Sequence, residues 1–367
     1  MNDKKLIIGI TAGDCNGIGY EIILKAFSDP RLSEMFTPVV YGSRKYLTHY
    51  RNELKLENVN FQLVDNIGAA QTKKLNLINC VSDTADLQPG VVTKEAGTGS
   101  LEALERATKD LLENKIHALV TAPINKENIQ ADAFKFPGHT EYLEKACGAD
   151  DSLMFLVSPD LKIGVVTGHV PVAQVASKIS VEKILSKLKL MNESLKRDFL
   201  IRKPKIAVLG LNPHAGDNGL LGKEEIDIIS PAIAKAKEMG IFAHGPYSAD
   251  GFFGNGVYKN FDGVLGMYHD QGLIPFKTLS FGSGVNFTAG LPIVRTSPDH
   301  GTAYEIAGKN QADESSFRNA LYSAMDILAN RKIQKEVSAN PLVITDKDKM
   351  ERGRYSEEEK HLRGMEN

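Results

Sequence analysis

The chain has 367 residues, of which 42% are hydrophobic and 25% charged, and its formal net charge is −2. Because this length exceeds that of a usual single hydrophobic core, we expect two domains of an ordinary soluble globular protein. The near-neutral charge offers no broad basic surface for nucleic acid, and no apolar run approaches the ~20 residues that span a bilayer.

The N-terminal segment and the cysteines indicate the compartment. The first residues hold two lysines but only a short apolar run, too brief for the core of a signal peptide. Cys15, Cys80 and Cys147 are far apart and show no CxxC spacing, which is typical of reduced thiols that serve in packing. We therefore expect a cytoplasmic protein without membrane or nucleic-acid partners.

Short β-branched runs alternate with amphipathic helical stretches, which predicts an α/β fold with parallel strands joined by helices. One predicted helix covers 181–199, with Ser180 as its N-cap and a buried stripe of Ile184, Leu188, Met191 and Leu195. The expected strands are LIIGI (6–10), TPVVYG (37–42), HALVTAP (117–123), KIGVVTG (162–168), KIAVLGLN (205–212), GIFAHGP (240–246) and FDGVLGMY (261–268).

Polar loops after these strands are expected to carry the chemistry, since ligands of α/β sheets gather beyond the carboxyl ends of strands. The loop AGDCNGIGYE lacks the GxGxxG spacing of a dinucleotide site, so any dinucleotide must bind elsewhere. In FPGHTEYLEKA, His139 and Thr140 stand at the start of a predicted helix, where free amides and the helix dipole favour an anion. The alternative is a simple N-cap.

Three of the nine histidines occupy equivalent positions, each directly after an apolar strand. They are His169 in VVTGHV, His214 in VLGLNPHAG and His269 in VLGMYHDQG. Each alone could be a hydrogen-bonded loop histidine, but three together favour a ligand set. Three imidazoles leave coordination positions open, as a catalytic metal requires.

Other candidates are weaker taken one by one. Lys277, Asn286 and Arg295 recur every nine residues in a glycine-rich stretch that suits a phosphate or carboxylate. We assign no role to His49, His117 and His361, and in FAHGPYSADG we prefer Asp250 to His244.

The motifs GITAGDCNGIGYEI, VTAPINK, FPGHTEYL, TGHVP, GLNPHAGDNGLLGKEE, GPYSAD, YHDQGLIPFK and GVNFTAGLPIVRTSPDHGTAYEIAGKNQA together resemble the 4-hydroxythreonine-4-phosphate dehydrogenase family of vitamin B6 biosynthesis. The resemblance covers residue 6 to about 330. The chain departs from the family pattern at Cys15-Asn16, Tyr20, Tyr247-Ser248 and the charged C-terminal extension.

The resemblance implies an isocitrate and isopropylmalate dehydrogenase-like fold of two α/β/α domains with an active-site cleft between them. We predict a first domain from 1–140 plus 295–340, a second from 141–294 and a charged tail at 341–367. By the same resemblance NAD, with NADP as the alternative, contacts His300, Gly301, Thr302, Ala303 and Asn310. The alternative is that this segment has no cofactor role and only begins a helix capped by Thr302.

The resemblance also matches the family's metal ligands to His169, His214 and His269, with Zn²⁺, Co²⁺ or Mg²⁺ as the ion. In the family the third histidine comes from the other subunit, which implies a homodimer with shared active sites. The family's substrate ligands match His139, Thr140, Lys277, Asn286 and Arg295.

The implied reaction oxidises a phosphorylated hydroxy-amino acid with NAD and then removes its carboxyl group. Asp250 and Asp270 are our candidates for proton transfer, with orientation of the histidines as the alternative for Asp270. D-Threonate or D-erythronate 4-phosphate is the alternative substrate. Rival classes are a phosphate-ester metallohydrolase, an acyltransferase, or a ligand-binding module without turnover.

Overall fold

A computed structural model describes residues 6–82, 86–130 and 134–340. The predicted charged tail at 341–367, with His361, lies outside these residues. The chain divides into two compact units, Met1–Asn330 and Arg331–Asn367, and every strand and site residue discussed below belongs to the first.

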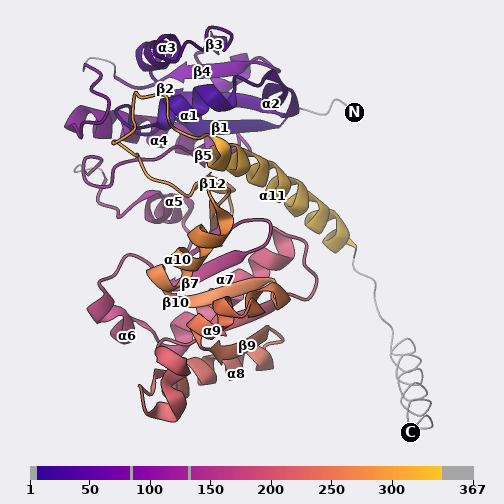
Figure 1. The fold of residues 1–367 in the computed structure, drawn as a ribbon. Helices are drawn as coiled ribbons and strands as arrows, with labels where there is room; N and C mark the ends of the chain where they lie inside the picture. The colour runs from indigo at the N-terminus through magenta and orange to yellow at the C-terminus, as the bar shows by residue number, and fades with distance from the viewer. Residues whose placement is uncertain (1–5, 83–85, 131–133, 341–367) are drawn as a thin grey trace. The chain divides into compact units, whose positions relative to one another are not determined.

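In the described part of the chain, twelve strands form one sheet in the order β3-β4-β2-β1-β5-β12-β11-β6-β7-β10-β8-β9 (Figure 1). The strands are β1 (Ile7–Thr11), β2 (Thr37–Gly42), β3 (Phe61–Leu63), β4 (Leu75–Asn79), β5 (Ala118–Thr121), β6 (Leu153–Val157), β7 (Lys162–Thr167), β8 (Lys205–Leu209), β9 (Phe242–Tyr247), β10 (Gly263–Tyr268), β11 (Val285–Ala289) and β12 (Arg295–Pro298).

The α-helices are α1 (Gly19–Ala26), α2 (Pro30–Met35), α3 (Arg44–Glu53), α4 (Lys94–Leu112), α5 (His139–Cys147), α6 (Val175–Lys178), α7 (Val181–Arg197), α8 (Ser230–Glu238), α9 (Ala249–Gly254), α10 (His269–Ser280) and α11 (Ser315–Ala339). Shorter helical turns are η1 (Ile67–Ala69), η2 (Val172–Gln174), η3 (Pro213–Gly219), η4 (Glu225–Ile229) and η5 (Val257–Asn260).

The seven expected strands all form, as β1, β2, β5, β7, β8, β9 and β10, so the α/β fold class is confirmed. The expectation of parallel pairing is only partly right. β11 pairs antiparallel with both β12 and β6, and β6 pairs antiparallel with β7. The antiparallel strands β6 and β11 lie in the middle of the sheet order, away from its edges.

Both faces of β8 are buried. Along β8, Ile206 and Val208 belong to the main hydrophobic core, while Ala207 and Leu209 belong to a second core with Phe252. Successive strand residues point to opposite faces, so this division shows packed layers on the two sides of β8. Such double coverage explains why the strands appear in the sequence as nearly continuous apolar runs.

The predicted helix is confirmed as α7. The hydroxyl of Ser180 accepts a hydrogen bond from the Lys183 backbone N–H at 3.2 Å, as an N-cap should. The predicted stripe is fully buried, with Ile184, Leu188, Met191 and Leu195 each 0% exposed.

The order of the strands supports our division into two domains, which remains a proposal. The six strands from β3 to β12 come from 1–140 and 295–340, whereas the six from β11 to β9 come from 141–294. The pairing of β11 with β12 joins the two sets. Among the described residues, no helix has both the length and the apolar character needed to cross a bilayer.

Candidate active site

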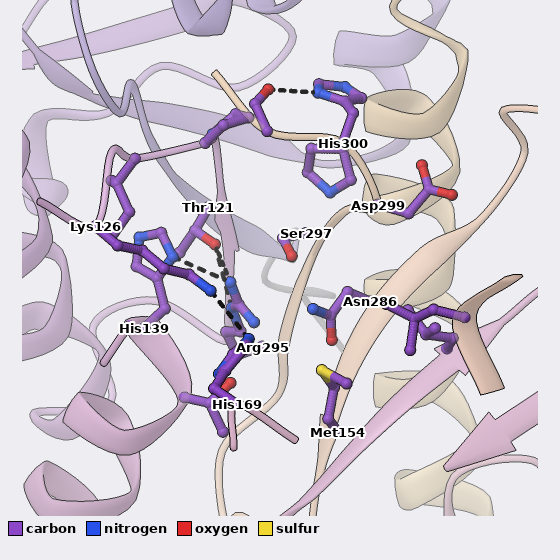
Figure 2. A pocket seen from close by; sticks show the side chains of 18 of the residues that line it. Thr121, Lys126, His139, Met154, His169, Asn286, Arg295, Ser297, Asp299 and His300 are labelled. Atoms are coloured by element: carbon purple, nitrogen blue, oxygen red, sulfur yellow. Dashed lines mark hydrogen bonds between the residues drawn. The ribbon is translucent and has the colours of Figure 1, made fainter. Parts of the chain in front are cut away.

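A cavity of about 290 Å³ is lined by residues that follow β5, β7 and β10 and by residues of β11 and β12 (Figure 2). It contains all five predicted substrate ligands and two of the three predicted metal ligands. Those residues are His139, Thr140, Lys277, Asn286, Arg295, His169 and His269. Segments far apart in the sequence therefore meet at one place, and what each does there remains a prediction.

The guanidinium of Arg295 is the central charge of the cavity. Arg295 is 3% exposed, and Thr121 Oγ1 accepts hydrogen bonds from its Nε at 3.1 Å and its Nη2 at 2.6 Å. A third bond runs from Nη1 to Thr288 Oγ1 at 3.3 Å. Burial lowers the pKa of Arg295 to about 10.

No carboxylate among the described residues forms an ion pair with Arg295. A buried cation is costly unless an anion compensates it. Four of its five N–H donors are engaged by Thr121, Thr288 and His139, and the remaining Nη1–H could donate to an oxygen of a carboxylate or phosphate. The arrangement around Arg295 therefore suits an anionic ligand, as predicted for this residue.

His139 is the first residue of α5, as predicted, and it lies beside Arg295. The N-cap is Gly138 and makes no side-chain capping bond, so neither His139 nor Thr140 is a simple N-cap. Burial, and then the nearby charges of Arg295 and Lys126, hold the pKa of His139 well below its usual range.

The tautomer of His139 follows from its neighbour. Arg295 Nη2 lies 3.3 Å from His139 Nδ1, and a guanidinium can only donate, so Nδ1 is the acceptor. The proton of the neutral ring is then on Nε2, which is buried and has no partner. Asn286 Oδ1 on β11 is likewise buried without a partner. A ligand could satisfy both groups, since buried polar atoms are normally hydrogen-bonded.

His169 and His269 converge, with ring centroids 5.8 Å apart. His169 follows β7, and His269 opens α10 directly after β10. Asp270 Oδ1 lies 2.7 Å from His269 Nδ1, so this contact occupies Nδ1 and leaves Nε2 as the ring nitrogen that could bind a ligand. Glu141 Oε1 lies 3.9 Å from His169 Nδ1.

His214 does not line the cavity. It lies in η3, where five consecutive residues from His214 to Asn218 have positive φ values between 42° and 82°. Each non-glycine residue in such a conformation costs on the order of 1–3 kcal/mol, so surrounding contacts must hold the turn. Within 6–82, 86–130 and 134–340, no three histidine, cysteine or acidic side chains are placed to hold a metal ion. A single chain thus brings together His169 and His269 but not His214.

Asp250 lies near His214, away from the cavity. Its carboxylate accepts a hydrogen bond from Ser248 Oγ at 2.5 Å. That bond and the Gly251 backbone N–H lower the pKa of Asp250, and the charge of His214 contributes. Of the two predicted proton-transfer residues, Asp270 therefore accompanies His269 and Asp250 accompanies His214.

The residues expected to bind NAD lie between β12 and α11, where residues 301–314 form turns and irregular chain. A helix start capped by Thr302, the alternative reading, is therefore wrong. His300 and Gly301 line the cavity, and Thr302, Ala303 and Asn310 do not. The Ile18 backbone N–H donates to the Thr302 carbonyl at 3.0 Å, so the GDCNGIG loop supports this segment.

Asp14 in the same loop makes a second contact with the segment. Its Oδ2 accepts a hydrogen bond from the Tyr304 hydroxyl at 2.8 Å. Asp14 is 0% exposed, so this contact is internal. Cys15, Asn16 and Tyr20, the departures from the family pattern in this loop, are all buried and none of them lines the cavity.

Sequence reasoning missed Lys126 and Glu141. Lys126 Nζ lies 3.0 Å from His169 Nε2, and burial lowers its pKa. The pKa of Glu141 is also lowered, chiefly by its interaction with His169, whose Nδ1 lies 3.9 Å from Glu141 Oε1. Both stand in quoted motifs, VTAPINK and FPGHTEYL, and Glu141 follows Thr140 directly. For Glu141, its position next to the predicted substrate ligand Thr140 was the sequence signal that could have identified it.

Comparison with known proteins identifies relatives along most of the chain. The family model described as "Pyridoxal phosphate biosynthetic protein PdxA" matches residues 34–324. A 4-hydroxythreonine-4-phosphate dehydrogenase from Bacteroides thetaiotaomicron is 51% identical over 343 residues, which cover 93% of this chain and 94% of the relative.

Another relative and a solved structure extend the comparison. A protein from Oceanobacillus iheyensis whose name refers to D-threonate 4-phosphate dehydrogenase is 41% identical, over 88% of this chain and 98% of its own. The crystal structure of a 4-hydroxythreonine-4-phosphate dehydrogenase from Klebsiella pneumoniae is 37% identical with a TM-score of 0.77. It covers 89% of this chain and 99% of its own.

Proposed function

The chain belongs to the pyridoxal phosphate biosynthetic protein PdxA family, and we propose that it is an NAD-dependent 4-hydroxythreonine-4-phosphate dehydrogenase, with NADP as the alternative acceptor. In this reaction the C3 hydroxyl of 4-phosphohydroxy-L-threonine loses its proton, and C3 transfers a hydride to nicotinamide. The resulting ketone then loses CO₂ by cleavage of its C1–C2 bond, and C2 takes up a proton, which gives 3-amino-2-oxopropyl phosphate for pyridoxal 5'-phosphate biosynthesis.

The observation that carries this proposal is the buried Arg295 guanidinium without a carboxylate partner. The substrate has two anionic groups, a phosphate and a carboxylate. Arg295 and Lys277 supply positive charge at the cavity, and His139 Nε2–H supplies a neutral donor. Held by these groups, the substrate cannot rotate freely, so C3 stays aligned for hydride transfer.

The residues present fit a divalent metal shared between two subunits. His169 and His269 of one chain would hold it together with His214 of a second chain, and the ion would be Zn²⁺, Co²⁺ or Mg²⁺. The ion would supply a positive charge that makes the substrate hydroxyl more acidic and stabilises negative charge during decarboxylation. The pairing of His169 and His269 without His214 supports a homodimer with shared active sites.

We assign different roles to the two aspartates. Asp270 Oδ1 is already engaged with His269 Nδ1 at 2.7 Å, so we assign it to orientation of that imidazole. Asp250 would enter the shared site together with His214 and remains the candidate for proton transfer. We propose that the cofactor reaches the cavity along His300 and Gly301, with Thr302, Ala303 and Asn310 beyond it.

We also propose a cytoplasmic protein without nucleic-acid partners. The net charge of −2 gives no support for nucleic-acid binding. Free cysteines at Cys15, Cys80 and Cys147 suit a reducing cytoplasm.

A paired-substrate assay tests the function. Purified protein with Co²⁺ and NAD is given 4-phosphohydroxy-L-threonine or D-threonate 4-phosphate, and NADH absorbance is recorded. We expect NADH and CO₂ from the first substrate. NADH from D-threonate 4-phosphate alone would instead assign the chain to sugar-acid oxidation, the function named for the Oceanobacillus iheyensis relative.

The same assay separates the redox proposal from the other classes. Release of inorganic phosphate without NADH would indicate a metallohydrolase. Binding of either substrate without any product, measured calorimetrically, would indicate a ligand-binding module.

A further inference from the structure

The carboxylate of Glu225 lies inside the loop that carries His214. Glu225 is 3% exposed, and its Oε1 accepts hydrogen bonds from the backbone N–H groups of Leu211 at 2.7 Å and Asn212 at 2.8 Å. Its Oε2 accepts a bond from Asn212 Nδ2 at 2.9 Å. One side chain thus fixes the backbone two and three residues before His214.

Two glycines leave the space that this carboxylate occupies. A Cβ atom at Gly210 would lie 3.0 Å from Glu225 Oε1, and one at Gly216 would lie 2.6 Å from Oε2. Gly210 precedes the left-handed turn and Gly216 lies within it, with a φ of +82°. The Glu225 carboxylate therefore bridges the entry to the turn and its middle.

Glu225 has no cationic partner to stabilise its burial. Among the described residues it takes part in no ion pair with lysine, arginine or histidine. A buried carboxylate without such a partner depends on hydrogen-bond donors, and the donors here all belong to the His214 loop. The burial of the Glu225 carboxylate therefore depends on the conformation of the His214 loop.

We propose that Glu225 is a positioning residue for metal binding. By holding the left-handed turn from His214 to Asn218, it places the His214 imidazole where it can join His169 and His269 of a second subunit. This inference rests on the shared metal site proposed above. It predicts that loss of the Glu225 bonds weakens metal binding even though Glu225 is not itself a ligand.

The test compares Glu225→Gln with a matched control, Glu224→Gln. Both changes remove one negative charge from adjacent residues. Glu224 Oε2 accepts from the Asn212 side chain at 2.8 Å, and the Glu224 carboxylate bonds no backbone N–H of residues 211–218 in the described structure. In Glu225→Gln the new amide N–H₂ faces Asn212 Nδ2, another donor, so one of the three bonds fails.

Full-length, metal-stripped protein is titrated with Co²⁺ alone by calorimetry, and the visible absorption of the bound Co²⁺ is recorded. We expect Glu225→Gln to bind Co²⁺ about tenfold to 100-fold more weakly, with a changed Co²⁺ spectrum and a nearly unchanged Tm. Glu224→Gln should match the wild type in affinity and spectrum. The spectrum reports the ligand set, which a purely structural role of Glu225 would leave unaltered.

The His214→Ala variant tests the shared metal site separately from the positioning role of Glu225. If the wild type binds no Co²⁺, or His214→Ala binds it as tightly as the wild type, the shared metal site is wrong. If His214→Ala weakens binding but Glu225→Gln does not, only the role of Glu225 is overturned. Should Glu225→Gln fail to fold, Glu225→Asp shortens the carboxylate and keeps its charge. Wild-type Co²⁺ affinity in that variant would equally contradict the inference.

Discussion

The Nδ1 atom of His139 lies 3.3 Å from Nη2 of Arg295, so a neutral imidazole accepts a hydrogen bond from a buried guanidinium. Burial, and then the positive charge of Arg295, hold the pKa of His139 well below its usual range. The pair thus offers a ligand one fixed positive charge and one neutral donor.

Replacement of Arg295 by Met should weaken substrate binding with little change in stability. One N–H of Arg295 is not engaged by Thr121, Thr288 or His139, so one charge-assisted hydrogen bond to the substrate, worth about 1.5–3 kcal/mol, would be lost, and we expect kcat/KM to fall by at least about tenfold. The Tm should change little, because the cost of burying a cation is removed together with its hydrogen bonds to Thr121, Thr288 and His139. Steady-state kinetics and thermal unfolding measure the two effects.

The control for this prediction is Arg31→Met. Arg31 is exposed and pairs with Asp29 at 2.7 Å outside the cavity, so kinetics and Tm should change little. A large Tm loss in Arg295→Met with unchanged KM would show that Arg295 is a structural residue.

His139 should make the folded protein less stable as the pH falls. The pKa of His139 is lowered in the folded state, whereas the unfolded imidazole titrates near its ordinary value of about 6.5. Above that pH both states are neutral and His139 adds no pH dependence. Below it, the unfolded state binds one more proton, so the free energy of unfolding falls by up to about 1.4 kcal/mol per pH unit.

His139→Gln supplies the comparison for the pH prediction. Denaturant unfolding between pH 7 and pH 5 should show a shallower decline in this variant than in the wild type. Equal slopes in the two proteins would mean that His139 is protonated in the folded state, against the position of its Nδ1 atom.

The sequence predicted the strands that precede the three histidines because these strands are apolar, β-branched and bounded by glycine or proline. β12 was missed because its residues, Arg295–Pro298, are polar although all are buried. No periodicity marks such a strand, since its burial depends on pairing with β5 and β11. Propensity cannot report contacts between residues that lie more than 150 positions apart.

The site shows the same limit. His169 and His269 were predictable because each directly follows a strand, and β7 and β10 are neighbours in the sheet. Lys126 was not predictable from its surroundings, because only the fold brings its Nζ to 3.0 Å from His169 Nε2. The separation of His214 from His169 and His269 likewise depends on the tertiary fold, so the sequence could not predict it.

Replacement of Gly17 by Ala should weaken NAD binding more than substrate binding. A Cβ atom at Gly17 would lie 2.8 Å from the Thr302 carbonyl oxygen, so the segment that carries Thr302 must shift. We expect the KM for NAD to rise about tenfold, which corresponds to about 1.4 kcal/mol of lost binding, with a smaller change in the substrate KM. Gly254→Ala is the control, since a Cβ there meets no atom within 4 Å. Equal changes in both KM values would place Gly17 outside cofactor binding.

Mixing two inactive variants should restore activity if the histidines are shared between subunits. His214→Ala and His169→Ala homodimers each lack one ligand at both sites. A heterodimer has one site with His169 and His269 from the first variant and His214 from the second, and this site is complete. After denaturation and joint refolding, half of the dimers are heterodimers with one working site, so about a quarter of wild-type activity should return. Mixing His169→Ala with His269→Ala is the control, because these two residues come from the same chain and no complete site can form. Equal recovery in both mixtures, or none in either, would contradict a site divided in this way.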